Sequence, residues 1–322
     1  MKNLYYKFWS QGRRTCDLGF RLFRLIDRFC CQRMQAYPDQ LQAHHETNIL
    51  QVSKCHNMVT HPDESYYCRQ YWHWIEKALK IFEKDKAGLG SPLIFDLGCG
   101  QGRLTLPLAK WCQRMGNGKV IGVDMSKPAL DFARHSAGQE GLDDFVEFVE
   151  NDILSLLHNQ ASSSCEVVVC TEVFYNFFSH QYKKVLEQVA RILAPGGLFI
   201  PSFRSRYFNI LYSVFNRSWT AIPILLESIE GFPFGPPTKF SWHNVDEITD
   251  ILVVAGFEVR SFKGIGICSG IESDPLAEIA RPSSLSPDEQ EELMKLELSL
   301  AETMADCGRY ILVEAIRKVD GN

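Results

Sequence analysis

An acidic residue and three glycines spaced two residues apart, Asp96, Gly98, Gly100 and Gly102, have the composition of a ligand-binding turn. They follow the apolar segment 93–95 and precede a helical pattern over 104–111. Glycine permits positive φ angles and close approach of the backbone to a ligand, and a helix start leaves N–H groups unpaired. The Asp96 carboxylate can accept an ammonium group or a ribose hydroxyl. A glycine turn without a ligand is the alternative.

Further acidic residues stand where later strands are expected to end. Apolar segments at 119–124, 146–150, 167–170 and 197–200 alternate with helical patterns at 128–137 and 181–193. This alternation predicts βαβ units and a parallel sheet, in which ligands bind at the carboxyl ends of the strands. Asp124, Asp152 and Glu172 all fall at those ends. Each acid alone is equally well explained as a helix cap or a surface carboxylate, but their repetition indicates one site.

The glycine spacing distinguishes between nucleotide cofactors. The dinucleotide fingerprint is G-x-G-x-x-G, whereas Arg103 stands here where its last glycine would be. With Asp96 before the glycines, the chain resembles the class I S-adenosylmethionine (SAM)-dependent methyltransferases. Asp124, the pair Asp152-Ile153, the segment 171–178 and the turn 191–197 extend the resemblance over roughly residues 91–202.

The resemblance implies both a fold and a cofactor. The fold is α/β, a seven-stranded and mostly parallel sheet with helices on both faces and an antiparallel last strand. Strand six is expected from 256 and strand seven over 309–316, with a lid insertion at 203–240. A second insertion at 268–307, between strands six and seven, departs from the short hairpin usual in the family, and it includes a helix expected to begin at a capping box of Ser286 and Glu289. The cofactor is SAM. Its expected contacts are Asp96, Gly98, Cys99, Gly100, Gly102, Asp124, Met125, Asp152, Ile153 and Glu172, with Tyr66 and Arg69 from the helix over 65–82.

The acceptor is expected to be a small, largely apolar molecule methylated on O, C or N. The segment Thr171–Phe174 lacks the (N/D)-P-P-(Y/F) motif of enzymes that methylate nucleobases, and the net charge of −5 argues against nucleic acid. The insertion 203–240 is rich in aromatic residues, which suggests an apolar pocket or, alternatively, a packed subdomain or dimer face. Expected acceptor contacts are Tyr175, Arg204, Tyr207, Phe234 and Trp242, and candidate bases are Glu172, Tyr175, His180 and His243. A protein methyltransferase and a non-catalytic SAM-binding accessory protein remain alternatives.

The N-terminal region differs from the rest of the chain. Residues 1–36 carry a net charge of +6, which leaves −11 for the remainder. We expect a basic amphipathic extension over 1–59 and a methyltransferase domain over 60–322. The amphipathic segment 18–34 fits a helix packed on the domain, a peripheral membrane contact or an organellar targeting segment. Scattered cysteines without a C-x-x-C pair indicate reduced thiols and no metal site, and we expect a cytoplasmic monomer or homodimer.

Overall fold

The computed structural model describes residues 61–85, 90–177, 179–234, 239–272 and 274–319. They all belong to one compact unit, Leu50–Asn322. The predicted extension 1–59, with its segment 18–34, lies outside the described residues, so its division from the domain at residue 60 stays a prediction. No helix in the described part of the chain is long and apolar enough to cross a membrane.

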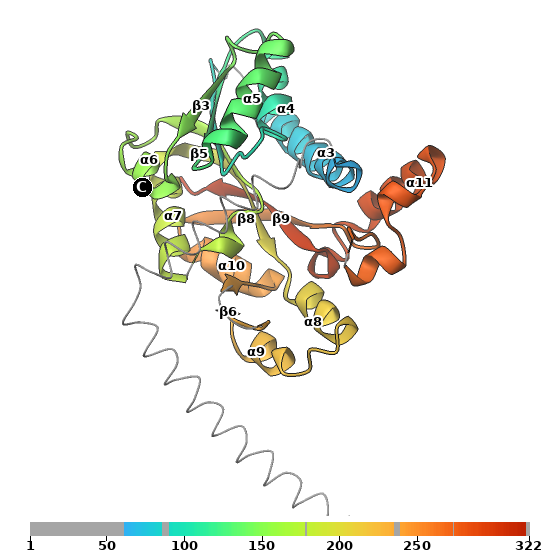
Figure 1. Cartoon of the computed structure of the whole chain (residues 1–322). Coiled ribbons are helices and arrows are strands. Elements are labelled where there is room, and N and C mark those ends of the chain that lie inside the picture. Colours follow the sequence, from blue (N-terminus) through green and yellow to red (C-terminus); the bar gives the residue numbers. More distant parts are fainter. Residues whose placement is uncertain (1–60, 86–89, 178, 235–238, 273, 320–322) are drawn as a thin grey trace, which may run out of the picture. The chain divides into compact units, whose positions relative to one another are not determined.

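A seven-stranded sheet forms the centre of the molecule (Figure 1). Its strands are β1 (Leu93–Leu97), β2 (Lys119–Asp124), β3 (Val146–Glu150), β4 (Cys165–Cys170), β5 (Leu193–Arg204), β8 (Phe257–Ile265) and β9 (Tyr310–Arg317). Their order is β3-β2-β1-β4-β5-β9-β8. Strands β1 to β5 pair in parallel, and β9 runs antiparallel to both neighbours. This confirms the predicted sheet with its antiparallel last strand.

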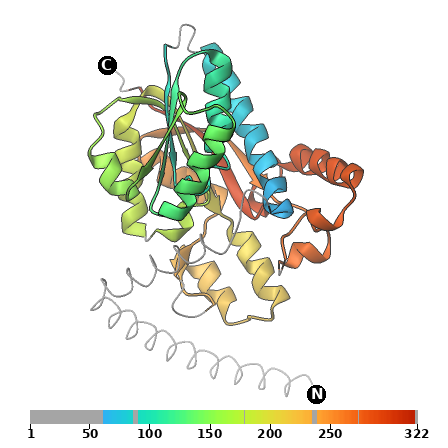
Figure 2. The same ribbon diagram turned by 45° about the horizontal axis from the view of Figure 1, so that its top comes forward.

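Helices cover both faces of this sheet (Figure 2). One face packs against α3 (Pro62–Asp85), α4 (Thr105–Met115) and α5 (Lys127–Gln139), and the other against α6 (Ile153–His158), α7 (Ser179–Ile192) and α10 (Val245–Val254). The central strands are apolar on both sides, as a doubly covered parallel sheet requires. Capping side chains determine where two of these helices begin. The Ser126 side chain accepts the Ala129 N–H at α5, and Asn244 and Glu247 form a capping box at α10.

The insertion after β5 forms a small layer of its own beyond the end of that strand (Figure 1). It contains α8 (Arg206–Phe215), α9 (Ala221–Glu227) and the short strands β6 (Glu230–Gly231) and β7 (Phe240–Ser241). Its core is Trp242, Ala221 and Leu225. The Trp242 Nε1–H points to the carbonyl oxygens of Leu225 and Ser228, at 3.0 and 2.8 Å. The insertion therefore has a small hydrophobic centre.

Two buried carboxylates, Glu297 and Asp63, connect the second insertion, between β8 and β9, to α3. The insertion contains the short 3₁₀ turns η2 (Pro275–Glu278), η3 (Pro282–Ser284) and η4 (Ala305–Cys307) and helix α11 (Pro287–Leu300), which starts at the predicted capping box of Ser286 and Glu289. Glu297 on α11 is 1% exposed. It accepts hydrogen bonds from the Tyr66 hydroxyl at 2.8 Å and the Gln70 amide at 2.5 Å, both on α3. This contact fixes α11 against α3.

Candidate functional site

The glycine loop crosses from β1 to α4 with three left-handed residues. Gly98, Gly100 and Gly102 have φ angles of 75°, 52° and 82°, a conformation that other residues adopt only at a cost. The N–H groups of Gly98 and Cys99 both donate to the Val123 carbonyl, at 2.8 and 3.0 Å. This places the loop beside the end of β2. A Cβ on Gly98 would lie 2.3 Å from the Val173 side chain, whereas one on Gly100 would meet no atom within 4 Å.

Two carboxylates from neighbouring strand ends flank this loop. Asp124 Oδ2 accepts the Gly100 N–H at 2.9 Å, and Oδ1 accepts the Ser126 N–H at 2.8 Å. Burial raises the pKa of Asp124, while these N–H groups oppose the shift. Asp96 is 3% exposed and accepts the Thr105 hydroxyl at 2.6 Å. Burial raises the pKa of Asp96 to about 6. Each Asp124 oxygen has further acceptor capacity for a ligand hydroxyl.

The remaining predicted cofactor residues differ in their burial and in their hydrogen-bond partners. Met125, directly after Asp124, is 39% exposed, so its side chain is free to cover a ligand. Cys99 is buried, and burial raises the pKa of its thiol well above the usual range. Asp152 accepts the Ser155 N–H at 2.9 Å and caps α6, and Ile153 is buried in the core beneath α6. The cap is the simpler of the two roles predicted for Asp152, and it leaves the second oxygen, Oδ2, for a ligand.

A buried arginine links the glycine loop to the end of β4. The Arg103 guanidinium contacts Glu172 at 2.6 Å and Glu64, from the first turn of α3, at 3.2 Å. It also lies over the Tyr71 ring, 5.6 Å from its centroid. Burial alone would lower the pKa of Arg103, but Glu172 and Glu64 raise it overall. Arg103 is therefore a permanent charge that fixes Glu172 beside the loop.

Glu172 is held in an unusual backbone conformation. Its φ is 58°, which is strained for a residue with a side chain, and its N–H donates to the Ser202 hydroxyl at 2.7 Å. Such strain often accompanies function. Arg103 occupies Oε1, and among the described residues no hydrogen bond or ion pair involves Oε2. Of the predicted bases, Glu172 thus keeps an oxygen to accept a proton.

Sequence reasoning missed most of this cluster. It treated Arg103 only as a departure from a glycine pattern, and it assigned no role to Glu64. The relevant signal is helical spacing, because Glu64, Cys68 and Tyr71 lie on the face of α3 that meets Arg103. The predicted contacts from α3 point elsewhere. Tyr66 bonds Glu297, and Arg69 forms an exposed ion pair with Glu291. The structure therefore argues against Tyr66 and Arg69 as cofactor contacts.

Aromatic rings gather where β5 and η1 (Phe174–Asn176) end beside β9. The Tyr175 and Tyr310 rings lie 6.0 Å apart. The Arg204 guanidinium is 5.9 Å from the Tyr175 ring and 5.8 Å from the Tyr310 ring. Tyr310 also experiences the charge of Glu172. The structure thus brings the predicted residues Glu172, Tyr175 and Arg204 into one continuous cluster next to the glycine loop.

Two other predicted residues are buried in structural positions. His243 is 1% exposed and packs edge-on against Tyr182 and Phe203, at 5.8 and 5.5 Å. Burial lowers its pKa to about 4, and neither ring nitrogen has a hydrogen-bond partner among the described residues. A neutral imidazole closed off in this way is poorly placed to take a proton from an acceptor. Trp242 is fully buried in the core of the first insertion, so its side chain supports the insertion.

The other predicted residues lie farther out. His180 is exposed near the start of α7. Tyr207 is exposed on α8. Phe234 stacks on Phe240 at 5.8 Å, and Phe240 in turn contacts Arg204 at 5.7 Å. Phe234 therefore borders the cluster through one intervening ring, and the catalytic and acceptor-binding roles of His180 and Tyr207 stay predictions.

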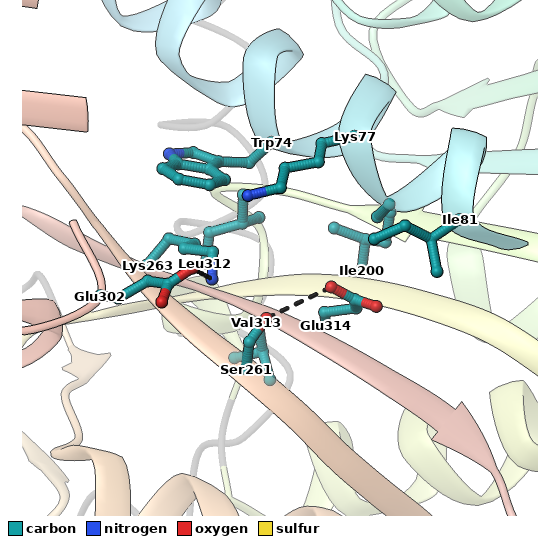
Figure 3. A pocket seen from close by; sticks show the side chains of 11 residues that line it. Trp74, Lys77, Ile81, Ile200, Ser261, Lys263, Glu302, Leu312, Val313 and Glu314 are labelled. Atoms are coloured by element: carbon teal, nitrogen blue, oxygen red, sulfur yellow. Dashed lines mark hydrogen bonds and ion pairs between the residues drawn. The ribbon is translucent and has the colours of Figure 1, made fainter. Parts of the chain in front are cut away.

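A separate hollow of about 200 Å³ lies between α3 and the strands β5, β9 and β8 of the sheet (Figure 3). Trp74 and Lys77 project into it from α3, and Ser261 and Lys263 from β8. Lys263 pairs with Glu302 at 2.6 Å. No residue of the glycine loop lines it. Because ligands of such sheets bind at the carboxyl ends of the strands, this hollow is not the candidate active site.

Comparison with known proteins defines the class of this protein. A family model described as a methyltransferase domain matches residues 94–197. A demethylmenaquinone methyltransferase from Thermus thermophilus is 30% identical over 183 residues, which cover 52% of this chain and 74% of the relative. The chain belongs to the class I SAM-dependent methyltransferases. Its cofactor is SAM.

A second curated relative covers less of this chain, and a solved structure shares its fold. A ubiquinone biosynthesis O-methyltransferase from Coxiella burnetii is 27% identical over 123 residues, 38% of this chain and 47% of that protein. The solved structure of a SAM-dependent methyltransferase from Methanosarcina mazei aligns with a TM-score of 0.50 at 17% identity, over 72% of this chain and 95% of that one. This second likeness supports the fold alone.

The residues of the loop fit this cofactor. Open space in front of Gly100 leaves room for a ligand against the backbone. The Gln101 side-chain oxygen is buried in the same loop and has no partner among the described residues, an arrangement that a bound polar group would relieve. Asp124, at the mouth of the loop, would hold the ribose hydroxyls of a bound cofactor, and Asp96 lies deeper, at the end of β1.

Proposed function

We propose that this protein transfers the methyl group of SAM to O, C or N of a small, largely apolar molecule. The observation that carries the proposal is the aromatic cluster of Tyr175, Tyr310 and Arg204 immediately beyond Glu172. It continues directly from the glycine loop, through Arg103. Two relatives are named for demethylmenaquinone and ubiquinone, which agrees with an acceptor of this kind.

The chain's own residues act mainly by placement. The bound SAM supplies a methyl group already activated on sulfur, so alignment and exclusion of water account for most of the rate. Asp124 holds the cofactor's ribose, and the rings of Tyr175 and Tyr310 form an apolar wall for the acceptor. Glu172 Oε2 takes a proton where the acceptor must lose one, while Arg103 keeps the side chain in place.

A protein substrate is the second candidate. A ribosomal protein L11 methyltransferase from Clostridium botulinum is 30% identical over 109 residues, although these are only 30% of that protein. The identity is confined to about a third of this chain. In a non-catalytic accessory role, the protein would bind SAM through the same loop but would not transfer its methyl group.

Transfer of a labelled methyl group separates these functions. Tritiated-methyl SAM and the purified protein are incubated with a cell extract, which is then divided into a solvent-extractable fraction and a protein fraction. We expect label in the solvent-extractable fraction, and much less with Asp124→Ala. Label in protein alone would favour the second candidate. No transfer, with SAM still bound, would favour the accessory role.

A further inference from the structure

Arg204 differs from the other two arginines near the site in its partners. Arg103 is paired with Glu172 and Glu64, and Arg309 with Asp274. Arg204 has no ion pair within the described part of the chain. Its Nε donates to the Asn209 side-chain oxygen at 3.0 Å. Its two terminal nitrogens have no hydrogen-bond partner among the described residues.

Aromatic rings surround the Arg204 guanidinium, and an acid that senses its charge, Asp274, forms its ion pair with Arg309 instead. Four rings lie within 6 Å of the Arg204 guanidinium, those of Phe208 at 5.5 Å, Phe240 at 5.7 Å, Tyr310 at 5.8 Å and Tyr175 at 5.9 Å. Ring faces attract a cation, but they do not satisfy the donors of a guanidinium. Asn209 is itself buried and fixed by the Ser205 carbonyl. Arg204 is therefore preorganised, with its fork of terminal donors unused.

The position of this fork links it to the acceptor. Arg204 ends β5, and Tyr175 follows the end of β4 just after Glu172. Tyr310 experiences the charges of both Glu172 and Arg204. Arg204 thus lies in one cluster with Tyr175 and Tyr310, beside Glu172, where the acceptor is proposed to bind. A planar fork of this kind binds a carboxylate through two parallel hydrogen bonds.

We propose that Arg204 is a specificity residue that binds a carboxylate on the methyl acceptor. The acceptor is then an organic acid with a flat, apolar body, which packs against the Tyr175 and Tyr310 rings while its acid group reaches Arg204. This inference rests on the proposed function, because it names the substrate class for the same site.

Binding of matched acids and amides tests this subsite. The probes are 3,4-dihydroxybenzoate with 3,4-dihydroxybenzamide, and 2-naphthoate with 2-naphthamide, titrated by calorimetry into protein saturated with S-adenosylhomocysteine. In at least one pair we expect the acid to bind at least about tenfold more tightly than the amide. In Arg204→Met the difference should shrink to within about twofold. Arg217→Met, an exposed position of the same insertion, should keep the preference.

Equal binding of acid and amide in both pairs, or no binding of either acid up to 10 mM, would overturn the inference. So would an acid preference that survives in folded Arg204→Met. If that variant does not fold, the comparison of acid and amide binding by the unaltered protein still tests the inference. Failure of the proposed function looks different, because S-adenosylhomocysteine would then not bind, or the labelled methyl would not reach small molecules.

Discussion

Replacing Asp124 with alanine tests the predicted ribose-binding part of the cofactor site. The carboxylate ends β2 and accepts two backbone N–H groups, from Gly100 at 2.9 Å and Ser126 at 2.8 Å. In the complex the same oxygens are expected to accept the two ribose hydroxyls. Asp124→Ala removes both sets of bonds, whereas Asp124→Asn keeps one oxygen and loses the charge.

The magnitude follows from the number and type of these bonds. A hydrogen bond to a charged group contributes about 1.5–3 kcal/mol, part of which water recovers in a partly open site. We therefore expect Asp124→Ala to weaken SAM binding by about 1–3 kcal/mol, or about 5- to 150-fold. The free energy of unfolding should fall by a similar amount, because the N–H groups of Gly100 and Ser126 lose their acceptor. Asp124→Asn should lie between alanine and the unaltered protein.

Calorimetric titration of SAM at pH 7.5, together with urea unfolding, measures both effects. Asp131→Ala on α5 is the control, since Asp131 is exposed and pairs only with Lys127 and Arg134. It should change either quantity by less than about 0.5 kcal/mol. A folded Asp124→Ala protein that binds SAM within twofold of the unaltered protein would refute the assignment of the ribose site.

Three further predictions concern single positions. Gly98→Ala should prevent stable folding, because its Cβ would lie 2.3 Å from the Val173 side chain. Gly100→Ala should fold but bind SAM at least about tenfold more weakly. Circular dichroism measures folding and calorimetry measures SAM binding, and equal behaviour of the two variants would contradict this account of the loop. Asp96, with a pKa of about 6 when folded, binds a proton more readily in the folded than in the unfolded state, so the free energy of unfolding should fall as the pH rises from about 4 to 6. In urea unfolding of Asp96→Asn, this decrease in the free energy of unfolding should be smaller by up to about 3 kcal/mol. Identical pH profiles for the variant and the unaltered protein would rule out a raised pKa of Asp96. Glu297→Ala should lower the free energy of unfolding by more than about 3 kcal/mol, because five donor groups lose an acceptor at about 1 kcal/mol each. A loss below about 1 kcal/mol would show that α11 is held in some other way.

The sheet and the cofactor loop were predictable because their signals are local. Apolar runs placed the first five strands, four of which are followed by acidic residues, and the spacing of the three glycines separated this loop from a dinucleotide turn. Capping residues such as Ser286 placed the start of α11. Each of these signals depends on residues close together in the chain, where backbone geometry and side-chain chemistry decide the outcome.

The contacts that complete the site were not predictable, because they join residues far apart in the sequence. Tyr66 and Glu297 are separated by 231 positions, and nothing near Tyr66 indicates that it turns toward α11 rather than the cofactor. Trp242 looked like an acceptor contact by residue type, but it closes the core of its insertion. The pairing of Arg103 with Glu172 depends on how α3 and the end of β4 meet, which tertiary packing decides.

A crystal structure of the complex with S-adenosylhomocysteine tests the central claim most directly. We expect the ribose hydroxyls on Asp124, the ligand backbone in front of Gly100, and the sulfur facing Tyr175 and the Arg204 cluster. A ligand bound elsewhere, such as the hollow beside Trp74, or one with its sulfur turned away from Tyr175, would contradict the account.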